Sequence, residues 1–228
     1  MKQARASETK GIKEMRAEVD LIDFTPEELL APAGRVCYQS FKKQSKEGDK
    51  NLIKHFCKLG HLSVLEHGKA SFLVRGGSRS FTHQMVRHRH TAISQESQRY
   101  CDEGNFGYVI PPNIKACGKN TEELFKDCME DYRKKYMMFQ KILKQNGFKK
   151  ANEDARFLLP NAVCSEIYLT ANYAQWRHCF DKRCTVHAQW EIRGIAMQML
   201  KLLKDVVPSV LEDYIIAEDG GTAKREVK

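Results

Sequence analysis

Apolar and polar side chains follow regular spacings along most of the chain. Residues 14–25, EMRAEVDLIDFT, alternate as expected for a half-buried strand. The next stretch, TPEELLAPAGRVCYQS, predicts a helix with Thr25 as its N-cap, Pro26 at the first helical position and Glu28 completing a capping box. The chain therefore opens with a strand followed by a helix.

The same two spacings continue through residue 90. Residues 51–60, NLIKHFCKLG, place their apolar side chains on one helical face, and residues 69–76, KASFLVRG, alternate as a strand. Residues 78–90, SRSFTHQMVRHRH, predict a helix with Phe81 and Met85 on its buried side. Its last turn would carry a run of basic side chains.

The second half of the chain has mainly helical spacing. Residues 121–147 predict a long helix capped by Asn120, and residues 165–178 and 187–207 predict two more. We interpret the apolar stripe of the long helix as core, consisting of Phe125, Met129, Tyr132, Tyr136, Phe139 and Leu143. Since no repeat, low-complexity tract or linker occurs, we expect residues 1–228 to form one helix-rich α+β domain with a mixed or antiparallel sheet.

Composition narrows the class of protein. Hydrophobic residues make up 42% of the chain and charged residues 29%, which is typical of a soluble globular protein. No stretch is apolar enough for a membrane helix or a signal peptide, and the eight cysteines lack CxxC spacing, so we expect a cytoplasmic protein with reduced, mostly buried thiols. The net charge of +9 suggests an anionic partner, although we assign about half of this excess to solubility alone.

The densest basic segment is RHRHTAISQESQRY at residues 87–100. A helix C-terminus favours cations, which explains one or two of these charges but not the whole run with the hydroxyl and amide donors that follow it. Guanidinium forks match phosphate, and neutral donors can complete a shell around it. From the residues alone, a phosphate or nucleotide site, a nucleic-acid patch and a solvated, salt-bridged loop all remain open.

A second basic segment, WRHCFDKRCTVHAQWEIR, spans residues 176–193. It contains the chain's two tryptophans together with Arg177, Lys182, Arg183 and Arg193. Ordinary packing with a cation stacked over an indole is one explanation, and a contact with an anionic base or phosphate is the other.

Other kinds of site are less favoured. The histidines at 83, 88 and 90 lack i, i+4 spacing and a carboxylate partner, so no metal site is predicted. The absence of a GxSxG elbow and of an activated cysteine argues against a nucleophilic enzyme, and the absence of GxGxxG argues against a Rossmann enzyme. A nucleic-acid-binding segment would need interleaved aromatic side chains, whereas only Tyr100 occurs in the first basic segment.

Five segments in order resemble the flavin-dependent thymidylate synthases. They are GHLSVLEH, RHRHTAISQES continued by SQRY, ARFLLP, ANYAQWRH and RCTVHAQWEIR. The similarity covers about residues 15–207, and residues 216–228 would form a basic tail. It implies a homotetramer with FAD bound between subunits, which converts dUMP to dTMP with methylenetetrahydrofolate as carbon donor and NADPH as reductant, and which has no nucleic-acid or membrane partner.

The resemblance also implies roles for individual residues. FAD would be contacted by Arg87, His88, Arg89, Ser63, Gln95, Asn172 and His178. The dUMP contacts would be Gln84, Arg87, Gln95, Glu96, Ser97, Gln98, Arg99, Arg156 and Arg183. Among these, Arg183 matches the arginine that favours the N3-ionised form of the uracil ring, which activates C5 without a covalent nucleophile.

Two further residues have alternative roles. Ser97 is expected to donate a hydrogen bond to the dUMP phosphate, although it could also be proposed as a nucleophile. His61 would lie beside the folate or flavin ring, or it would serve in packing.

Overall fold

A computed structural model of the chain describes residues 12–226, which group into two compact units. The described part of unit 1 comprises residues 12–16, 76–80 and 96–165, and that of unit 2 comprises residues 17–75, 81–95 and 166–226. Two long strands, β3 (Lys69–Ser78) and β6 (Cys164–Asn172), contribute residues to both units.

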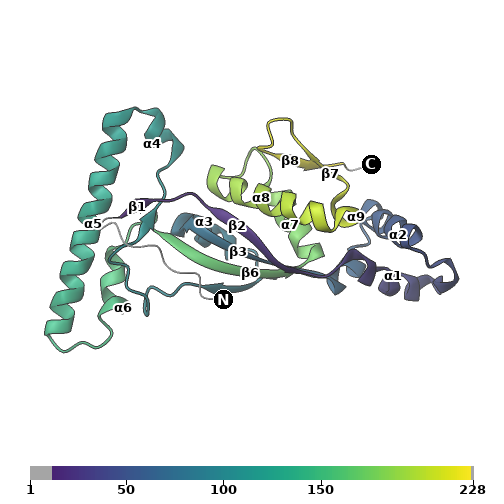
Figure 1. The fold of residues 1–228 in the computed structure, drawn as a ribbon, viewed down its shortest axis with the longest axis horizontal. Helices are drawn as coiled ribbons and strands as arrows, with labels where there is room; N and C mark the ends of the chain where they lie inside the picture. Colours follow the sequence, from purple (N-terminus) through teal and green to yellow (C-terminus); the bar gives the residue numbers. More distant parts are fainter. Residues whose placement is uncertain (1–11, 227–228) are drawn as a thin grey trace. The chain divides into compact units, whose positions relative to one another are not determined.

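Unit 2 is built around most of a four-stranded sheet of order β2-β3-β6-β4. Strand β2 (Glu18–Phe24) pairs antiparallel with β3, and β4 (Ala92–Gln95) pairs antiparallel with β6. Helix α8 packs against β2, as Figure 1 shows. The predicted α+β class with an antiparallel sheet is therefore confirmed.

Helices and short segments complete unit 2. Its helical segments are η1 (Glu27–Leu29), α1 (Ala31–Tyr38), η2 (Phe41–Lys43), α2 (Lys46–Leu59), η3 (Leu62–His67), most of α3 (Arg79–Met85), α7 (Tyr173–Arg183), α8 (Trp190–Val206) and α9 (Pro208–Leu211). A hairpin of β7 (Tyr214–Ile216) and β8 (Ala223–Arg225) follows, and its second strand lies in the segment expected to form a basic tail. The core lies among these elements and includes Phe72, Trp176, Leu200 and Leu203.

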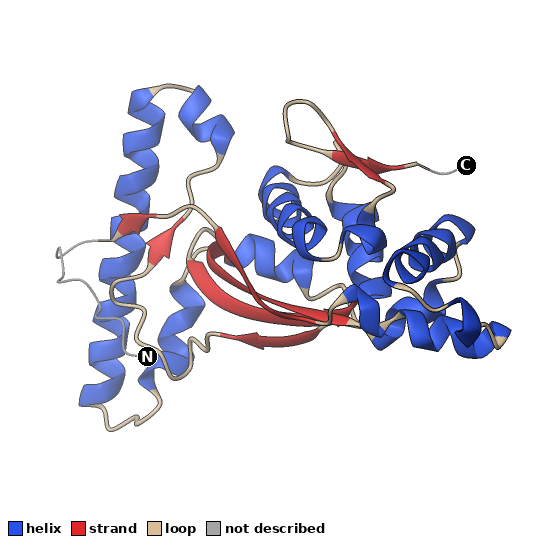
Figure 2. Ribbon diagram, turned by 45° about the vertical axis from the view of Figure 1, so that its right-hand side comes forward, coloured by secondary structure: helices blue, strands red, loops and turns tan. Residues whose placement is uncertain are grey.

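Unit 1 is organised by one long helix, α5 (Lys119–Gln145), with α6 (Ala151–Ala155) packed alongside it (Figure 2). Its other elements are a parallel pair of short strands, β1 (Lys13–Glu14) and β5 (Gly107–Tyr108), and the short helical segments α4 (Pro112–Ala116) and η4 (Arg156–Leu158). A small core forms around Phe106, Tyr108, Ile110, Met129 and Val163.

Residues 165–178 are not one helix as predicted. The first part forms β6, and α7 begins only at Tyr173, where the Asn172 side chain accepts a hydrogen bond of 2.8 Å from the Gln175 N–H. Burial alternates along β6, with Ile167 and Leu169 buried and Tyr168 more exposed. This period of two marks a strand, and the apolar content of the segment had concealed it.

The predicted capping box at Thr25 is also wrong. The Thr25 hydroxyl accepts a hydrogen bond of 3.1 Å from the Lys69 N–H, because β2 ends beside the start of β3. Residues 27–29 form a 3-10 turn, and the α-helix starts only at Ala31. A tertiary partner has therefore replaced the local one.

Other expectations hold in part. Helix α5 starts at Lys119 after Gly118, so Asn120 is not its cap, and Tyr132 and Phe139 of its apolar stripe are exposed while Met129 and Tyr136 are buried. Helix α3 ends at Met85, so the basic run lies in the turn that follows it.

All eight cysteines are free thiols, but four of them are exposed, so the expectation of mostly buried thiols is wrong. Within residues 12–226, every helix is too short or too polar to span a bilayer.

Candidate active site

In unit 2, the turn after α3 and the end of α7 bring a histidine and an arginine together. The Arg183 Nε donates a hydrogen bond of 3.0 Å to the His88 Nε2. His88 is only 6% exposed, and burial lowers its pKa to about 4, with Arg183 and His178 adding to the shift. His88 is therefore neutral at physiological pH and accepts the bond through Nε2.

Other predicted residues of unit 2 have different partners. The Gln95 Nε2 donates to the Thr82 Oγ1 at 3.2 Å, and the Gln84 Nε2 lies 3.5 Å from the Gln189 Oε1. That same oxygen accepts the N–H groups of Glu191 and Ile192 at the start of α8. The side chains of Gln84 and Gln95 are thus held by hydrogen bonds to other side chains of the unit.

The exposed arginines of the turn after α3 differ from these residues in having no partner in the part of the chain that the structure describes. Arg87 and Arg89 are exposed, and within residues 12–226 neither guanidinium has a hydrogen-bond or ion-pair partner. Ser63 lies exposed in η3, and the His178 ring centroid is 6.0 Å from that of His88. Two free guanidinium groups on one turn are well suited to bind phosphate groups.

The second basic segment is mainly structural. Arg177 is buried, forms a two-pronged ion pair with Asp213 at 2.6 and 2.7 Å, and stacks over Tyr214. Arg193 donates to backbone carbonyl groups of the preceding loop. Trp176 is buried and donates to the Ala70 carbonyl at 3.0 Å, which agrees with the packing explanation. Arg183 differs from these arginines, because neither of its terminal amino groups has a hydrogen-bond partner in the described chain.

Unit 1 contains the remaining predicted residues. The Arg99 Nη2 pairs with the Glu153 carboxylate at 3.1 Å, and the Arg156 Nε donates to the Glu153 carbonyl at 3.2 Å. Ser97 starts the turn that carries Arg99, because its Oγ and carbonyl accept backbone N–H groups of residues 99–101. One glutamate thus holds two of the arginines predicted to bind dUMP.

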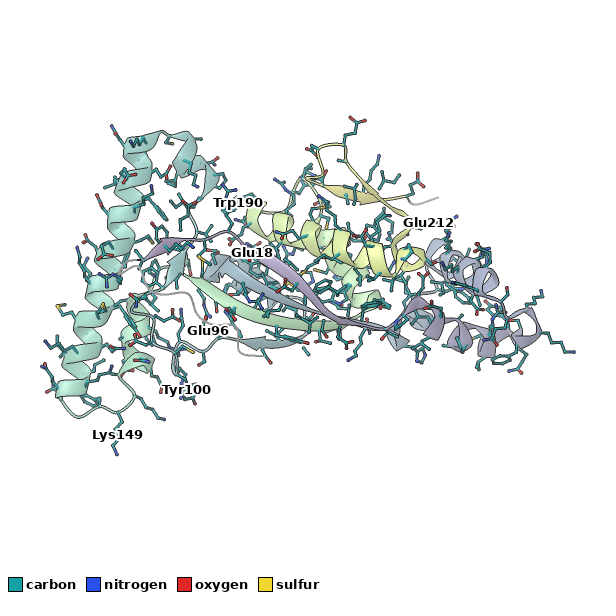
Figure 3. All side chains as sticks on the ribbon, viewed as in Figure 1. Glu18, Glu96, Tyr100, Lys149, Trp190 and Glu212 are labelled. Atoms are coloured by element: carbon teal, nitrogen blue, oxygen red, sulfur yellow. The ribbon has the colours of Figure 1, made fainter. Side chains whose placement is uncertain are left out.

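Buried polar groups lie next to these arginines in the sequence. Gln98 is 7% exposed, and neither its Nε2 nor the Arg99 Nε has a hydrogen-bond partner in the described chain. Burial raises the pKa of Glu103 to about 7; Glu96 adds to the shift, and Arg79 opposes it. Figure 3 labels Glu96, which precedes this turn, and Tyr100, which lies in it and is 77% exposed. Buried donors without partners are consistent with a ligand-binding segment.

Comparisons with known proteins place the chain in a family. Residues 20–209 match the family model described as thymidylate synthase complementing protein. The flavin-dependent thymidylate synthase of Nitratidesulfovibrio vulgaris is 39% identical over 84% of this chain and 84% of its own length. That of Clostridium tetani is 37% identical over 88% and 87%. The chain belongs to the flavin-dependent thymidylate synthase family.

The fold of this family member agrees with a solved structure. A UMP/dUMP methylase, PolB from Streptomyces cacaoi, bound with 5-Br dUMP, superposes with a TM-score of 0.71 at 23% identity and covers 88% of this chain and 95% of that one. The resemblance drawn from the five sequence segments is confirmed by the family match, which spans every candidate site residue.

Sequence reasoning missed the residues that hold the candidate side chains of this synthase family member. Glu153 lies three residues before Arg156, a helical spacing that could have indicated a contact. Thr82 and Gln189 gave no such signal, because each meets its partner through the tertiary fold.

Proposed function

We propose that the chain is an FAD-dependent thymidylate synthase. It transfers a one-carbon unit from methylenetetrahydrofolate to C5 of dUMP, consumes NADPH and a proton, and releases dTMP, tetrahydrofolate and NADP⁺. The observation that carries this proposal is the family match over residues 20–209, which contains every candidate site residue. The geometry of Arg183, Arg87 and Arg99 supports it.

The turn after α3 supplies groups that fit FAD. Arg87 and Arg89 offer free, exposed guanidinium groups, and Ser63 offers a hydroxyl. We assign these residues, together with His88, Gln95, Asn172 and His178, to the flavin. Asn172 also caps α7 through its Oδ1, which leaves its amide donors for a ligand. FAD, when bound, supplies the redox chemistry, and the protein supplies binding and electrostatics.

Arg183 is the residue that we assign to activating the pyrimidine. Its guanidinium stays charged at any physiological pH, and its Nε is fixed by His88. A fixed positive charge beside the uracil ring favours the N3-deprotonated form and increases electron density at C5. No covalent enzyme nucleophile is required in this scheme, and Ser97 serves as a hydrogen-bond donor.

The other dUMP contacts are assigned within each unit separately. We assign Arg99, Arg156, Ser97 and Gln98 of unit 1 to the dUMP phosphate, with Glu96 beside them. Within unit 2, we assign Gln84, Gln95 and Arg87 to dUMP, and Arg87 serves both ligands; in the proposed tetramer, some of the dUMP contacts come from a neighbouring subunit. The uncommitted Nε2 of buried Gln98 supports the assignment, because an anion would satisfy it.

We further propose a homotetramer whose active sites are shared between subunits. Exposed apolar side chains on α5, including Leu124, Met138 and Ile142, support burial of this helix against another subunit. One catalytic domain over residues 1–228 and a cytoplasmic location stay predictions from the sequence.

The first test is the visible spectrum of the purified, desalted protein after incubation with FAD. We expect flavin absorption that remains with the protein, followed by NADPH oxidation and dTMP formation that require both dUMP and methylenetetrahydrofolate. A colourless protein that instead retards single-stranded DNA in a gel would overturn the proposal in favour of a nucleic-acid role for the basic segments.

A further inference from the structure

His88 and Arg183 form a hydrogen bond in which only one assignment of donor and acceptor is possible. The Arg183 Nε can only donate, so the His88 Nε2 must accept at 3.0 Å and the ring proton must lie on Nδ1. A protonated imidazole would present two donors and a positive charge to the guanidinium. The contact therefore exists only with a neutral histidine.

The surroundings of His88 keep it neutral. Helix α7 presents Arg183, His178 and Cys179 to the ring, with the Cys179 Sγ 4.0 Å from the Nε2. The chain neighbours Arg87 and Arg89 add further positive charge to its own turn. Burial, with Arg183 and His178 adding to the shift, lowers the pKa of His88 to about 4, so protonation is disfavoured across the physiological range.

Both partners are fixed by their backbones. The His88 N–H donates to the Met85 carbonyl at 3.0 Å, and its carbonyl accepts the Thr91 N–H at 3.2 Å. After Arg183, the Cys184 N–H bonds to the Phe180 carbonyl, and the Cys184 carbonyl accepts the Ala223 N–H of β8 at 2.8 Å. The two side chains thus meet between ordered segments of one unit.

The bond uses only one of the five donors of Arg183. Its four terminal N–H donors have no hydrogen-bond partner within residues 12–226. Because the Nε is held by a neutral group, the positive charge of the guanidinium is not cancelled, as it would be by a carboxylate. The orientation of the Arg183 guanidinium is therefore fixed, and its full positive charge is retained.

We propose that His88 is a positioning residue, which accepts the Nε–H of Arg183 and thereby directs the terminal amino groups toward the pyrimidine. This proposal rests on the proposed function and goes beyond a contact of His88 with the flavin. It predicts that an uncharged acceptor is required at this place in the site.

The test compares His88→Gln with His88→Met in the full-length protein. The two replacements have similar length and volume, but the Gln Oε1 is a good acceptor in the place of Nε2, whereas the Met sulfur is only a weak one. We expect His88→Met to lower kcat by about thirtyfold, consistent with loss of a hydrogen bond to a charged group, and His88→Gln by about threefold. The Kd for FAD, measured by flavin fluorescence, should differ between the two variants by less than about threefold.

A second readout reports on orientation without turnover. The pH at which bound dUMP loses its N3 proton, followed by ultraviolet difference spectroscopy, should be about one unit higher in His88→Met than in His88→Gln. Equal kcat values and equal ionisation in the two variants would overturn the positioning role, as would loss of FAD from both. If Arg183→Ala itself leaves dUMP ionisation unchanged, the proposed function of Arg183 fails instead.

Discussion

The two units hold their candidate arginines in opposite ways. In unit 2, Arg183 is fixed by the neutral His88, whereas in unit 1, Arg99 is fixed by the carboxylate of Glu153. A neutral acceptor orients a guanidinium and leaves its charge intact, while a carboxylate orients it and cancels part of its field. The first arrangement suits stabilisation of a developing anion, and the second suits anchoring of a phosphate that already carries its charge.

The largest effect is expected at Arg183. Because its charge would stabilise the ionised uracil, Arg183→Ala should lower kcat by about a thousandfold, the range measured when one stabilising donor is removed from an active site. FAD should stay bound. Turnover measured by dTMP formation, together with the flavin spectrum, checks both statements.

The neighbouring Lys182 provides a matched control. It is exposed on α7 and has no partner in the described chain, so Lys182→Ala should keep near-normal turnover. Loss of the flavin in Arg183→Ala would contradict the assignment to the pyrimidine.

A smaller effect is expected in unit 1. Arg99→Ala should raise the KM for dUMP by about ten- to a hundredfold with a modest change in kcat, because it removes a charge-assisted contact with a phosphate. Glu153→Gln keeps a hydrogen-bond acceptor for Arg99 but removes the competing charge, and it should lower that KM by up to about threefold.

Steady-state kinetics at fixed ionic strength measure this pair of changes. The control is Lys149→Ala, an exposed lysine on the loop between α5 and α6 that is labelled in Figure 3, and it should leave the KM unchanged. An Arg99→Ala variant with normal KM and reduced kcat would place Arg99 at the reacting ring and not at the phosphate.

The contrast between the two arginines also marks the limit of sequence reasoning. The strands β2 and β3, the core side of α3 and helix α8 follow from spacing, because local periodicity determines which face is buried. The basic segments could be predicted because charge density can be read directly from the sequence. Their partners were not, since His88 and Arg183 are far apart in sequence and meet only through the fold.

The errors have the same origin. Thr25 bonds to Lys69 across the sheet in place of capping a helix. Strand β6 looked helical because its apolar content concealed the alternation, and its pairing partner β4 is distant in the chain. For Arg177, the sequence left packing and an anionic ligand open, and the ion pair with Asp213 shows the packing role. In each case a tertiary contact outweighs a local preference of about 1 kcal/mol.

The smallest effects concern one buried titratable group in each unit. His88 has its pKa lowered to about 4 and Glu103 has its pKa raised to about 7, in both cases mainly because burial disfavours the charged form. The folded chain binds fewer protons at His88 than the unfolded chain between pH 4 and 6.5, so this group makes stability rise with pH. Glu103 binds more protons when folded between pH 4.5 and 7, so it makes stability fall with pH.

These opposing pH dependences predict that the stability of two variants will change with pH in opposite directions relative to the wild type. Between pH 5 and pH 7, Glu103→Gln should gain about 1–2 kcal/mol in free energy of unfolding relative to the wild type, because only the His88 slope remains. His88→Gln should lose a similar amount over the same interval, because only the Glu103 slope remains. Urea unfolding at both pH values measures the difference. If the free energy of unfolding changed in the same direction in both variants, one of the two groups would be charged in the folded chain. A charged His88 would be incompatible with its bond to Arg183.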